Sequence, residues 1–352
     1  MIIIDSHLDL AMNALTLNRD LTKSVFEIRQ REVGMSGAGR SAGTVAFPEM
    51  RTGKIAVSFA TAFARRQEDG APPSGCSSVE IAYAVAQGQL AYYRVLASQG
   101  RVRIITDWNT LDAHIKEWQQ HTDNSPPLGF VISMEGADAI ISPEQVGLWW
   151  QDGLRIVSLS HYGVSTYAHG TGTTGGLTPL GRPLLKTMDD VGIILDVSHL
   201  SDDSFFQALE CFTGPVLASH NNCRALVPGD RQFTDEQIRL LIERNGVIGA
   251  AMDAWMLYPG WVKGETPNTV VNLDSVVDHI DHVCQLAGNA HHAAIGTDLD
   301  GGYGKEQCPH DLDTITDLQN IPALLAKRGY NEEDVRSIMY GNWLRLLQNA
   351  WM

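Results

Sequence analysis

The 352-residue sequence has few cysteines, fewer basic than acidic residues, and no long apolar run. Its five cysteines are far apart and include no C-x-x-C pair, which argues against a disulfide framework or a cysteine-based zinc site. Lysine and arginine number 26 against 41 acidic residues, and the formal net charge of −15 argues against a nucleic-acid partner. Because no run reaches roughly 18 apolar residues, we expect no membrane-spanning helix.

The N-terminus also lacks the charged region, apolar stretch and cleavage site of a secretory signal, so we expect a cytoplasmic protein. No internal repeat, heptad run or Pro/Gly/Ser-rich linker divides the chain. Hydrophobic residues make up 44% of the sequence, which is enough for a substantial core. We therefore expect one domain over residues 1–352, since single α/β barrels often reach this length.

Short apolar segments alternate with amphipathic segments along most of the chain. Strands are predicted from residue 2 onward and at 54–63, 128–134, 154–159, 191–197, 215–218, 245–252 and 293–296. Helices are predicted at 79–98, 106–121, 202–212, 235–244, 273–287, 311–328 and 332–351. This alternation favours an α/β fold with parallel strands, and eight strands suffice to close a (β/α)8 TIM-like barrel. An open doubly wound sheet is the alternative fold.

Polar residues suited to metal or proton chemistry follow most of these predicted strands. His7 and Asp9 end the first strand, and both should point the same way because side chains alternate faces along a strand. The other residues at strand ends are Glu135, His161, His199, His220 and Asp298. Each one alone is compatible with a capped strand or a structural histidine. Together they favour a barrel, because its chemistry lies at the carboxyl ends of the strands.

These residue types predict a site for two metal ions. Zinc binds histidine nitrogen and carboxylate oxygen, and two neighbouring ions need a bridging group. Glu135 suits the bridge because a glutamate can donate one oxygen to each ion. One ion would take His7, Asp9 and Glu135, and the other would take Glu135, His199 and His220. The expected cofactor is two Zn²⁺ per chain, with other divalent ions as alternatives.

A set of short motifs carries a resemblance to a known family. The motifs are Asp5-Ser6-His7-Leu8-Asp9, Met134-Glu135-Gly136, Ser158-Leu159-Ser160-His161, Asp196-Val197-Ser198-His199, Ser219-His220-Asn221, Gly296-Thr297-Asp298-Leu299-Asp300-Gly301 and Gly341-Asn342-Trp343-Leu344-Arg345. In order and spacing, the sequence resembles the membrane dipeptidase (renal dipeptidase) family of zinc-dependent peptidases. The resemblance implies a TIM-like barrel with a binuclear zinc site, and hydrolysis of free dipeptides that includes L-Xaa-D-Xaa. Its implied metal ligands are the same five residues.

The resemblance also implies three substrate contacts. His161 would approach the scissile carbonyl, Arg231 would bind the substrate carboxylate, and Asp298 would lie near the substrate amine. A free dipeptide carries both a carboxylate and an ammonium group, so a guanidinium and a carboxylate make chemical sense at its two ends. Arg224 is the competing candidate for the arginine, and Asp300 is expected to have a structural role.

The expected reaction is attack of a metal-bridging hydroxide on the peptide carbonyl. Glu135, His161 and Asp298 are the expected catalytic residues, with Asp298 as either a proton shuttle or an anchor for the amine. The expected partner is the dipeptide, without nucleic acid or membrane, and the family resemblance suggests a homodimer. Loops at 29–49, 69–78 and 165–181 are expected to shape substrate choice.

Two other functions remain open from the sequence. One is a related amidohydrolase-type barrel that acts on another amide, a lactone or a phosphoester. The other is a noncatalytic accessory protein that retains the barrel. The complete ligand set and Arg231 favour the dipeptidase over both.

Overall fold

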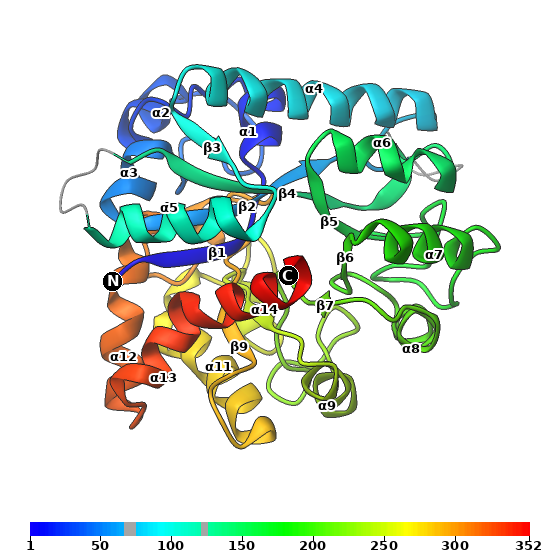
Figure 1. Cartoon of the computed structure of the whole chain (residues 1–352). Coiled ribbons are helices and arrows are strands. Elements are labelled where there is room, and N and C mark those ends of the chain that lie inside the picture. The colour runs from blue at the N-terminus through cyan, green and yellow to red at the C-terminus, as the bar shows by residue number, and fades with distance from the viewer. Residues whose placement is uncertain (67–74, 121–125) are drawn as a thin grey trace.

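A parallel sheet curls around the centre of the computed structural model, with helices on its outside (Figure 1). The structure describes residues 1–66, 75–120 and 126–352. The strand order is β1-β2-β4-β5-β6-β7, and the pair β8-β9 continues it through a parallel bridge between Ala218 and Ile248. The α/β, TIM-like barrel class predicted from the sequence is confirmed.

The strands of the barrel are mostly short. They are β1 (Ile3–Leu8), β2 (Ile55–Phe63), β3 (Val102–Ile104), β4 (Leu128–Glu135), β5 (Leu154–Ser158), β6 (Ile194–Asp196), β7 (Val216–Leu217), β8 (Ile248–Ala250) and β9 (Ala293–Ile295). Every predicted strand is present, although several are shorter than predicted. One further strand, β3, is not predicted from the sequence; it pairs with the first half of β4 outside the main path. A three-residue strand is too short to display a periodic pattern.

The helices are α1 (Leu10–Thr16), α2 (Val25–Arg31), α3 (Phe47–Thr52), α4 (Val79–Ser98), α5 (Trp108–Gln120), α6 (Val146–Gln151), α7 (Gly181–Val191), α8 (Asp202–Cys211), α9 (Asp235–Glu243), α10 (Ala254–Leu257), α11 (Leu273–Ala287), α12 (Ile321–Lys327), α13 (Glu332–Arg336) and α14 (Asn342–Trp351). The helix predicted over 311–328 begins with a 3-10 turn, Ile315–Asn320. A π-helical turn, Ser337–Gly341, interrupts the helix predicted over 332–351. Residue 121 and residues 69–74, which belong to a predicted helix and a predicted loop, lie outside the described residues.

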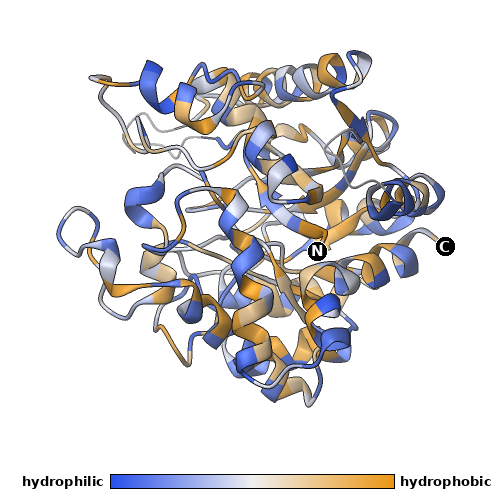
Figure 2. Cartoon of the chain, turned by 90° about the vertical axis from the view of Figure 1, so that its left-hand side faces the viewer, coloured by the Kyte–Doolittle hydropathy of each residue, from blue (hydrophilic) through white to orange (hydrophobic). Residues whose placement is uncertain are grey.

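The outer helices are amphipathic. In Figure 2 the hydrophobic colour is concentrated on the inner strands, whereas the outer helices alternate between hydrophobic and hydrophilic segments. Such helices bury one face on the sheet and leave the other in water. Within the parts of the chain that are described, no helix is both long enough and apolar enough to span a bilayer.

Side chains join β1 to β9, where the ring of strands closes. Asp5 accepts hydrogen bonds from the backbone nitrogen of Thr297 at 2.9 Å and from its hydroxyl at 2.6 Å. The Ser6 hydroxyl donates to the carbonyl oxygen of Ile295 at 3.0 Å. A Cβ atom on Gly296, directly after β9, would lie 1.8 Å from the backbone oxygen of Ser219 and 2.5 Å from the Ser6 hydroxyl, so only glycine fits there.

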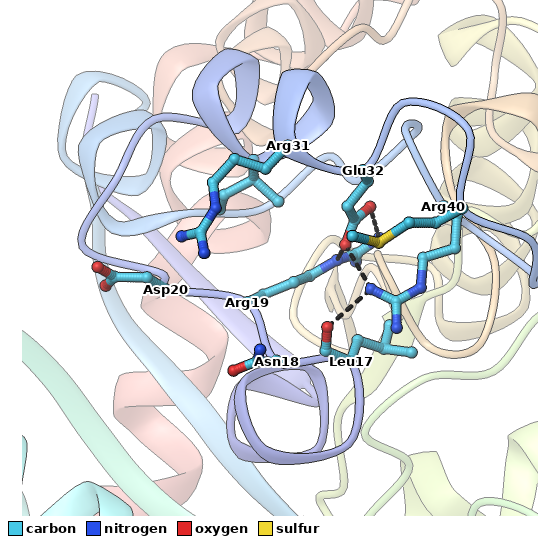
Figure 3. Close-up of a pocket in the computed structure, with 9 residues that line it drawn as sticks. Leu17, Asn18, Arg19, Asp20, Arg31, Glu32 and Arg40 are labelled. Carbon is cyan, nitrogen blue, oxygen red and sulfur yellow. Dashed lines mark hydrogen bonds and ion pairs between the residues drawn. The ribbon is translucent and has the colours of Figure 1, made fainter.

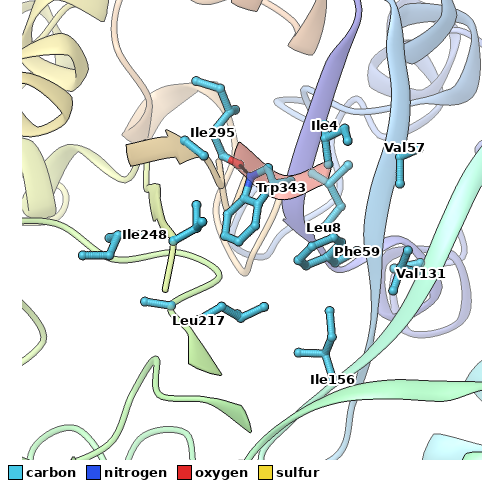
Figure 4. Close-up of a cluster of buried hydrophobic side chains, with 14 of the residues drawn as sticks. Ile4, Leu8, Val57, Phe59, Val131, Ile156, Leu217, Ile248, Ile295 and Trp343 are labelled. Carbon is cyan, nitrogen blue, oxygen red and sulfur yellow. Dashed lines mark hydrogen bonds between the residues drawn. The ribbon is translucent and has the colours of Figure 1, made fainter. Parts of the chain in front are cut away.

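The indole ring of Trp343, from α14, fills the barrel interior (Figure 4). Its ring centroid lies 5.2 Å from that of Phe59 in an edge-on arrangement, and Nε1 donates to the Ile295 carbonyl at 3.0 Å. Aliphatic side chains from other strands surround it, namely Ile4, Leu8, Val57, Val131, Ile156, Leu217 and Ile248. The C-terminal helix therefore completes the core of the barrel.

We expect Trp343→Ala to lower the free energy of unfolding by about 3–5 kcal/mol, because it removes a buried aromatic ring and leaves a cavity. Trp343→Phe should cost less, since an aromatic ring remains and the loss is limited to part of the indole and its hydrogen bond to Ile295. Urea midpoints followed by far-UV circular dichroism measure both effects. Asn349→Ala, at an exposed position of the same helix, is the control. Equal midpoints for Trp343→Ala and the wild type would contradict this role.

Candidate metal centre

Glu135, the last residue of β4, lies at the centre of the predicted site residues. Its Oε1 atom is 3.1 Å from His199 Nε2 and 3.2 Å from His220 Nε2. Its Oε2 atom is 3.8 Å from His7 Nε2 and 3.9 Å from His161 Nε2. The two oxygens of one carboxylate thus face different histidines, as a bridging ligand requires.

The ligand atoms form three overlapping groups, each with mutual distances within 4.8 Å. The groups are His7, Asp9 and Glu135; Glu135, His199 and His220; and His7, His220 and Asp298. The first two are the same sets that the sequence predicts for two ions. The third brings in Asp298, whose Oδ1 atom is 3.8 Å from His7 Nε2. All five predicted metal ligands, with Asp298, are therefore close together.

His7 and Asp9 converge, but not through the simple strand alternation that the sequence analysis assumed. The pairing of β1 with β2 has a register irregularity between Asp5 and Leu8, and Asp9 lies beyond the strand, as the N-cap residue before α1. His7 Nε2 lies 3.8 Å from Asp9 Oδ2. Both side chains thus lie in one group with Glu135, at the end of a strand whose pairing is irregular.

The second ring nitrogen of each central histidine has its own partner. His220 Nδ1 is 2.8 Å from the Ser219 hydroxyl, which in turn donates to Asp196 Oδ2 at 2.5 Å. His199 Nδ1 is 3.1 Å from the Thr171 hydroxyl. Contacts of this kind fix the ring orientation of metal-binding histidines and leave Nε2 for the metal.

Burial sets the charge of the centre. Burial and nearby positive charge lower the pKa values of His199 and His220 well below the usual imidazole range, so both rings are neutral at pH 7. Neutral imidazole is the form that binds metal. Burial also lowers the pKa of His7, but the surrounding carboxylates, Glu135 foremost, outweigh it and raise that pKa to about 10. Burial raises the pKa of Glu135 to about 7.

Two buried atoms test whether these residues fit a metal ion. His7 Nε2 and Asp9 Oδ1 have no hydrogen-bond partner among the described residues. Buried polar atoms in folded proteins almost always have a partner, so atoms of this kind indicate a missing ligand or a reactive site. A divalent cation would satisfy both atoms and would favour the ionised carboxylates around them. The donor set therefore fits a divalent metal.

Two of the site residues have left-handed backbones. His199 has φ of 65° and Asp298 has φ of 58°, in a region that side-chain-bearing residues seldom occupy. The Thr171 nitrogen donates to the His199 carbonyl at 2.8 Å. Asp300, with φ of 62°, accepts from the Thr44 nitrogen at 2.7 Å and so fixes the loop after β9. This contact agrees with the structural role expected for Asp300.

A buried arginine, Arg19, is linked through hydrogen bonds to the end of β1. Arg19 donates to the Asn13 side chain at 2.8 Å and to Glu32 at 2.8 Å, and Figure 3 shows Arg19 and Glu32 in the lining of a nearby pocket. Asn13 in turn donates to the Asp9 carbonyl at 3.0 Å and to the Asp300 carbonyl at 2.9 Å. The loops that carry the outer ligands are thus tied to one another.

A cavity of about 200 Å³ adjoins the centre. Arg231, His161 and Asp298 all line it. Arg231 is only 2% exposed, and its guanidinium donates to the His220 carbonyl at 2.8 Å. Arg224 instead forms a two-pronged ion pair with Asp202, at 2.8 and 2.7 Å. The structure therefore brings Arg231, and not Arg224, to the cavity.

Several residues that line this cavity are not predicted from the sequence, including Tyr162, Asp253 and Trp255. Asp253 directly follows the strand predicted over 245–252, so the rule that selected the other strand-end residues also applies to it. Tyr162 and Trp255 carry no comparable signal. Their place in the cavity depends on loop conformations that the residue pattern does not fix.

A barrel with buried histidines and carboxylates at the carboxyl ends of its strands defines the class of metal-dependent hydrolases. A sequence model of the membrane dipeptidase family, peptidase family M19, matches residues 1–351, and the chain belongs to this family. The resemblance seen in the sequence is confirmed, and so is the prediction of an enzyme of the metallo-dipeptidase type.

Individual relatives agree with this assignment. Dipeptidase tcpJ of Claviceps purpurea is 30% identical over 202 residues, which are 56% of this chain and 45% of that protein. Dipeptidase 3 of Rattus norvegicus is 22% identical over 99% of this chain and 65% of its own length. A metallopeptidase from Rhodobacter sphaeroides, solved with a phosphinate mimic of L-Ala-D-Ala, superposes with a TM-score of 0.80 at 23% identity, over 100% of this chain and 99% of that one. The last likeness supports the fold.

We expect Asp196→Asn to weaken binding of a divalent metal about 10- to 100-fold, because the Ser219 hydroxyl that holds His220 loses its carboxylate acceptor. Titration of the metal-free protein with Zn²⁺ against a chelating indicator measures this affinity. Asp203→Asn, the same substitution at an exposed position of α8, is the control. Wild-type affinity in Asp196→Asn would show that this chain of contacts does not position the ligand.

Proposed function

We propose that the protein is a binuclear zinc dipeptidase that cleaves free dipeptides, including those of the L-Xaa-D-Xaa type. The observation that carries the proposal is the position of Glu135, with its two oxygens facing different histidines beside a cavity that also contains Arg231. His7, Asp9 and Glu135 would hold one ion, and Glu135, His199 and His220 the other. Such ions lower the pKa of water toward neutrality and polarise the peptide carbonyl.

The cavity offers a partner for each end of a dipeptide. The guanidinium of Arg231 would bind the substrate carboxylate, because it is a planar donor held in place by the His220 carbonyl. Asp298, from a different strand end, would serve the amino end. A small substrate with both charges fits this pair better than a lactone or a phosphoester does. The cavity volume of about 200 Å³ suits a ligand of dipeptide size.

His161 and Asp298 would act on the reacting bond. Burial lowers the pKa of His161 well below the usual range, so the ring is neutral and can donate a hydrogen bond to the oxyanion that develops on the carbonyl. Burial raises the pKa of Asp298 well above its usual range, which favours a carboxyl group able to hold a proton for the leaving amine. The same carboxylate, when ionised, would anchor the substrate ammonium. Glu135 would act through the bridge between the ions.

The Rhodobacter sphaeroides relative, which was solved with a phosphinate mimic of L-Ala-D-Ala, supports a D-residue at the C-terminal position of the substrate. The native metal, the cytoplasmic location and the homodimer remain predictions.

A panel of dipeptides tests the proposed activity. We expect the zinc-loaded protein to hydrolyse L-Ala-D-Ala and L-Ala-L-Ala, a chelator to abolish the activity, and added Zn²⁺ to restore it. Glu135→Ala should lose bound metal, measured by elemental analysis, and should lose at least about 1000-fold in kcat/KM because the bridge is gone. If metal-replete protein cleaves no dipeptide of either stereochemistry, the proposed function is wrong. Normal metal content and activity in Glu135→Ala would exclude the bridge.

A second test concerns the carboxylate end of the substrate. We expect the wild type to prefer L-Ala-D-Ala over its C-terminal amide by about 100-fold in kcat/KM, since the amide cannot pair with a guanidinium. Arg231→Met should remove most of this preference, and Arg231→Lys should retain part of it. Circular dichroism of each variant checks the fold, because the His220 carbonyl loses a donor. An unchanged preference in folded Arg231→Met would reject the assignment.

A further inference from the structure

A second cavity, of about 380 Å³, adjoins the one beside the metal centre. Tyr162, Asp253, Trp255, Gly301 and Gly302 line both cavities. The ring of Tyr162 lies against the rings of His161 and His199, with centroid distances of 4.8 and 5.1 Å. A molecule bound at the centre therefore has a second compartment within reach.

Asp253 is the only one of the shared lining residues that carries a formal charge. It is 6% exposed, and its two carboxylate oxygens accept from the Gln307 amide at 2.8 and 2.9 Å. Burial raises the pKa of Asp253 to about 6, so the group is still ionised at neutral pH. Among the described residues, no ion pair to Asp253 is formed; the exposed Lys263, which also lines the second cavity, lowers the pKa of Asp253 only as a minor contribution beside burial. A buried carboxylate without a cationic partner is costly, and a cation in the cavity would offset that cost.

The remaining walls also suit a cation. The aromatic rings of Tyr162, Trp255 and Trp261 line the second cavity, and the faces of such rings attract ammonium and guanidinium groups. Three buried polar atoms of the lining residues have no hydrogen-bond partner in the described structure: Gln307 Oε1, Tyr303 OH and Trp261 Nε1. Gln307 and Tyr303 are more than nine-tenths buried. The first of these atoms is an acceptor and the second can accept, so both can serve a cationic donor.

We propose that the second cavity receives a side chain of the dipeptide and selects a cationic one of lysine or arginine length, with Asp253 as its partner. This inference rests on the proposed dipeptidase function, and it specifies dipeptides with a cationic side chain as the preferred substrates. An acidic side chain would meet the Asp253 carboxylate, and an aliphatic one would leave that buried carboxylate without an ion-pair partner.

The side chain belongs to the N-terminal residue of the dipeptide. Gly301 and Gly302, which line both cavities, lie in the same loop as Asp298, the residue proposed to serve the substrate amine. In the ring of strands, Asp253 follows β8 and lies between the loop of Arg231 after β7 and the loop of Asp298 after β9. The cavity therefore opens beside the amino end of the bound substrate.

Three matched dipeptides test the proposal on the zinc-loaded enzyme: L-Lys-D-Ala, L-norleucine-D-Ala and L-Glu-D-Ala. Lysine and norleucine have chains of similar length and differ in the ammonium group, so the ratio of their kcat/KM values isolates the charge. We expect a ratio of at least about 10 in the wild type and a still lower rate for the glutamyl substrate. Asp253→Asn should bring the ratio close to one.

Lys263→Ala should have the opposite effect to Asp253→Asn. It removes a competing cation from the cavity and should therefore raise the ratio of kcat/KM for the lysyl over the norleucyl substrate. This side chain is exposed, so the substitution should leave folding intact even where Asp253→Asn does not. Glu243→Gln, which removes one negative charge from an exposed position of α9, is the matched control and should leave the ratio unchanged.

L-Ala-D-Ala is the reference substrate, because its hydrolysis tests the dipeptidase function separately from the cation subsite. If the enzyme hydrolyses L-Ala-D-Ala but its kcat/KM for L-Lys-D-Ala is no higher than for L-norleucine-D-Ala, the proposed cation subsite is wrong. The proposed dipeptidase function is unaffected by that result. A ratio that persists in folded Asp253→Asn would also overturn it. If none of the four dipeptides is cleaved, the proposed function itself is wrong.

Discussion

The closure of the barrel between β1 and β9 determines where the site residues lie. In the described structure no strand ladder pairs these two strands, and the Asp5 carboxylate with the Thr297 hydroxyl and nitrogen joins them instead. His7 lies two residues after Asp5, and Asp298 directly follows Thr297. The contacts that close the ring therefore also bring groups from opposite ends of the sequence to within 3.8 Å of each other. Stability and site geometry depend on the same few atoms.

Burial has opposite effects on the two kinds of group in the centre. It raises the pKa values of Glu135 and Asp298 and lowers those of His199 and His220. Both shifts favour neutral groups, and a neutral imidazole is ready to bind a metal while a carboxyl group must first give up a proton. Metal binding should thus release protons from the acidic ligands and from His7, whose pKa the surrounding carboxylates raise to about 10. The contacts of Ser219 with His220 and of Thr171 with His199 also fix the orientation of the two imidazole rings.

Much of the barrel and of the candidate site could be predicted because most strands are apolar segments followed closely by a polar residue. That local rule found Glu135, His199 and His220 without any knowledge of contacts. It could not find the supporting roles of Asp196 or Thr171, because those depend on neighbours that are distant in sequence. It also placed His7 and Asp9 together, but it gave no sign of the irregular register between β1 and β2, which depends on the partner strand. The same rule could have identified Asp253, which follows a predicted strand. It could not identify β3, because a strand of three residues shows no clear pattern.

The indole of Trp343 in the barrel interior links folding to the order of synthesis. The strands it packs against are made from the beginning of the chain onward, but this ring belongs to the last helix. During translation the apolar interior therefore stays incomplete until the ribosome has released almost the whole sequence. Chains with such long-range closure fold late and expose apolar strands in the meantime. A nascent chain of this protein should consequently depend on chaperones for longer than its helix content suggests.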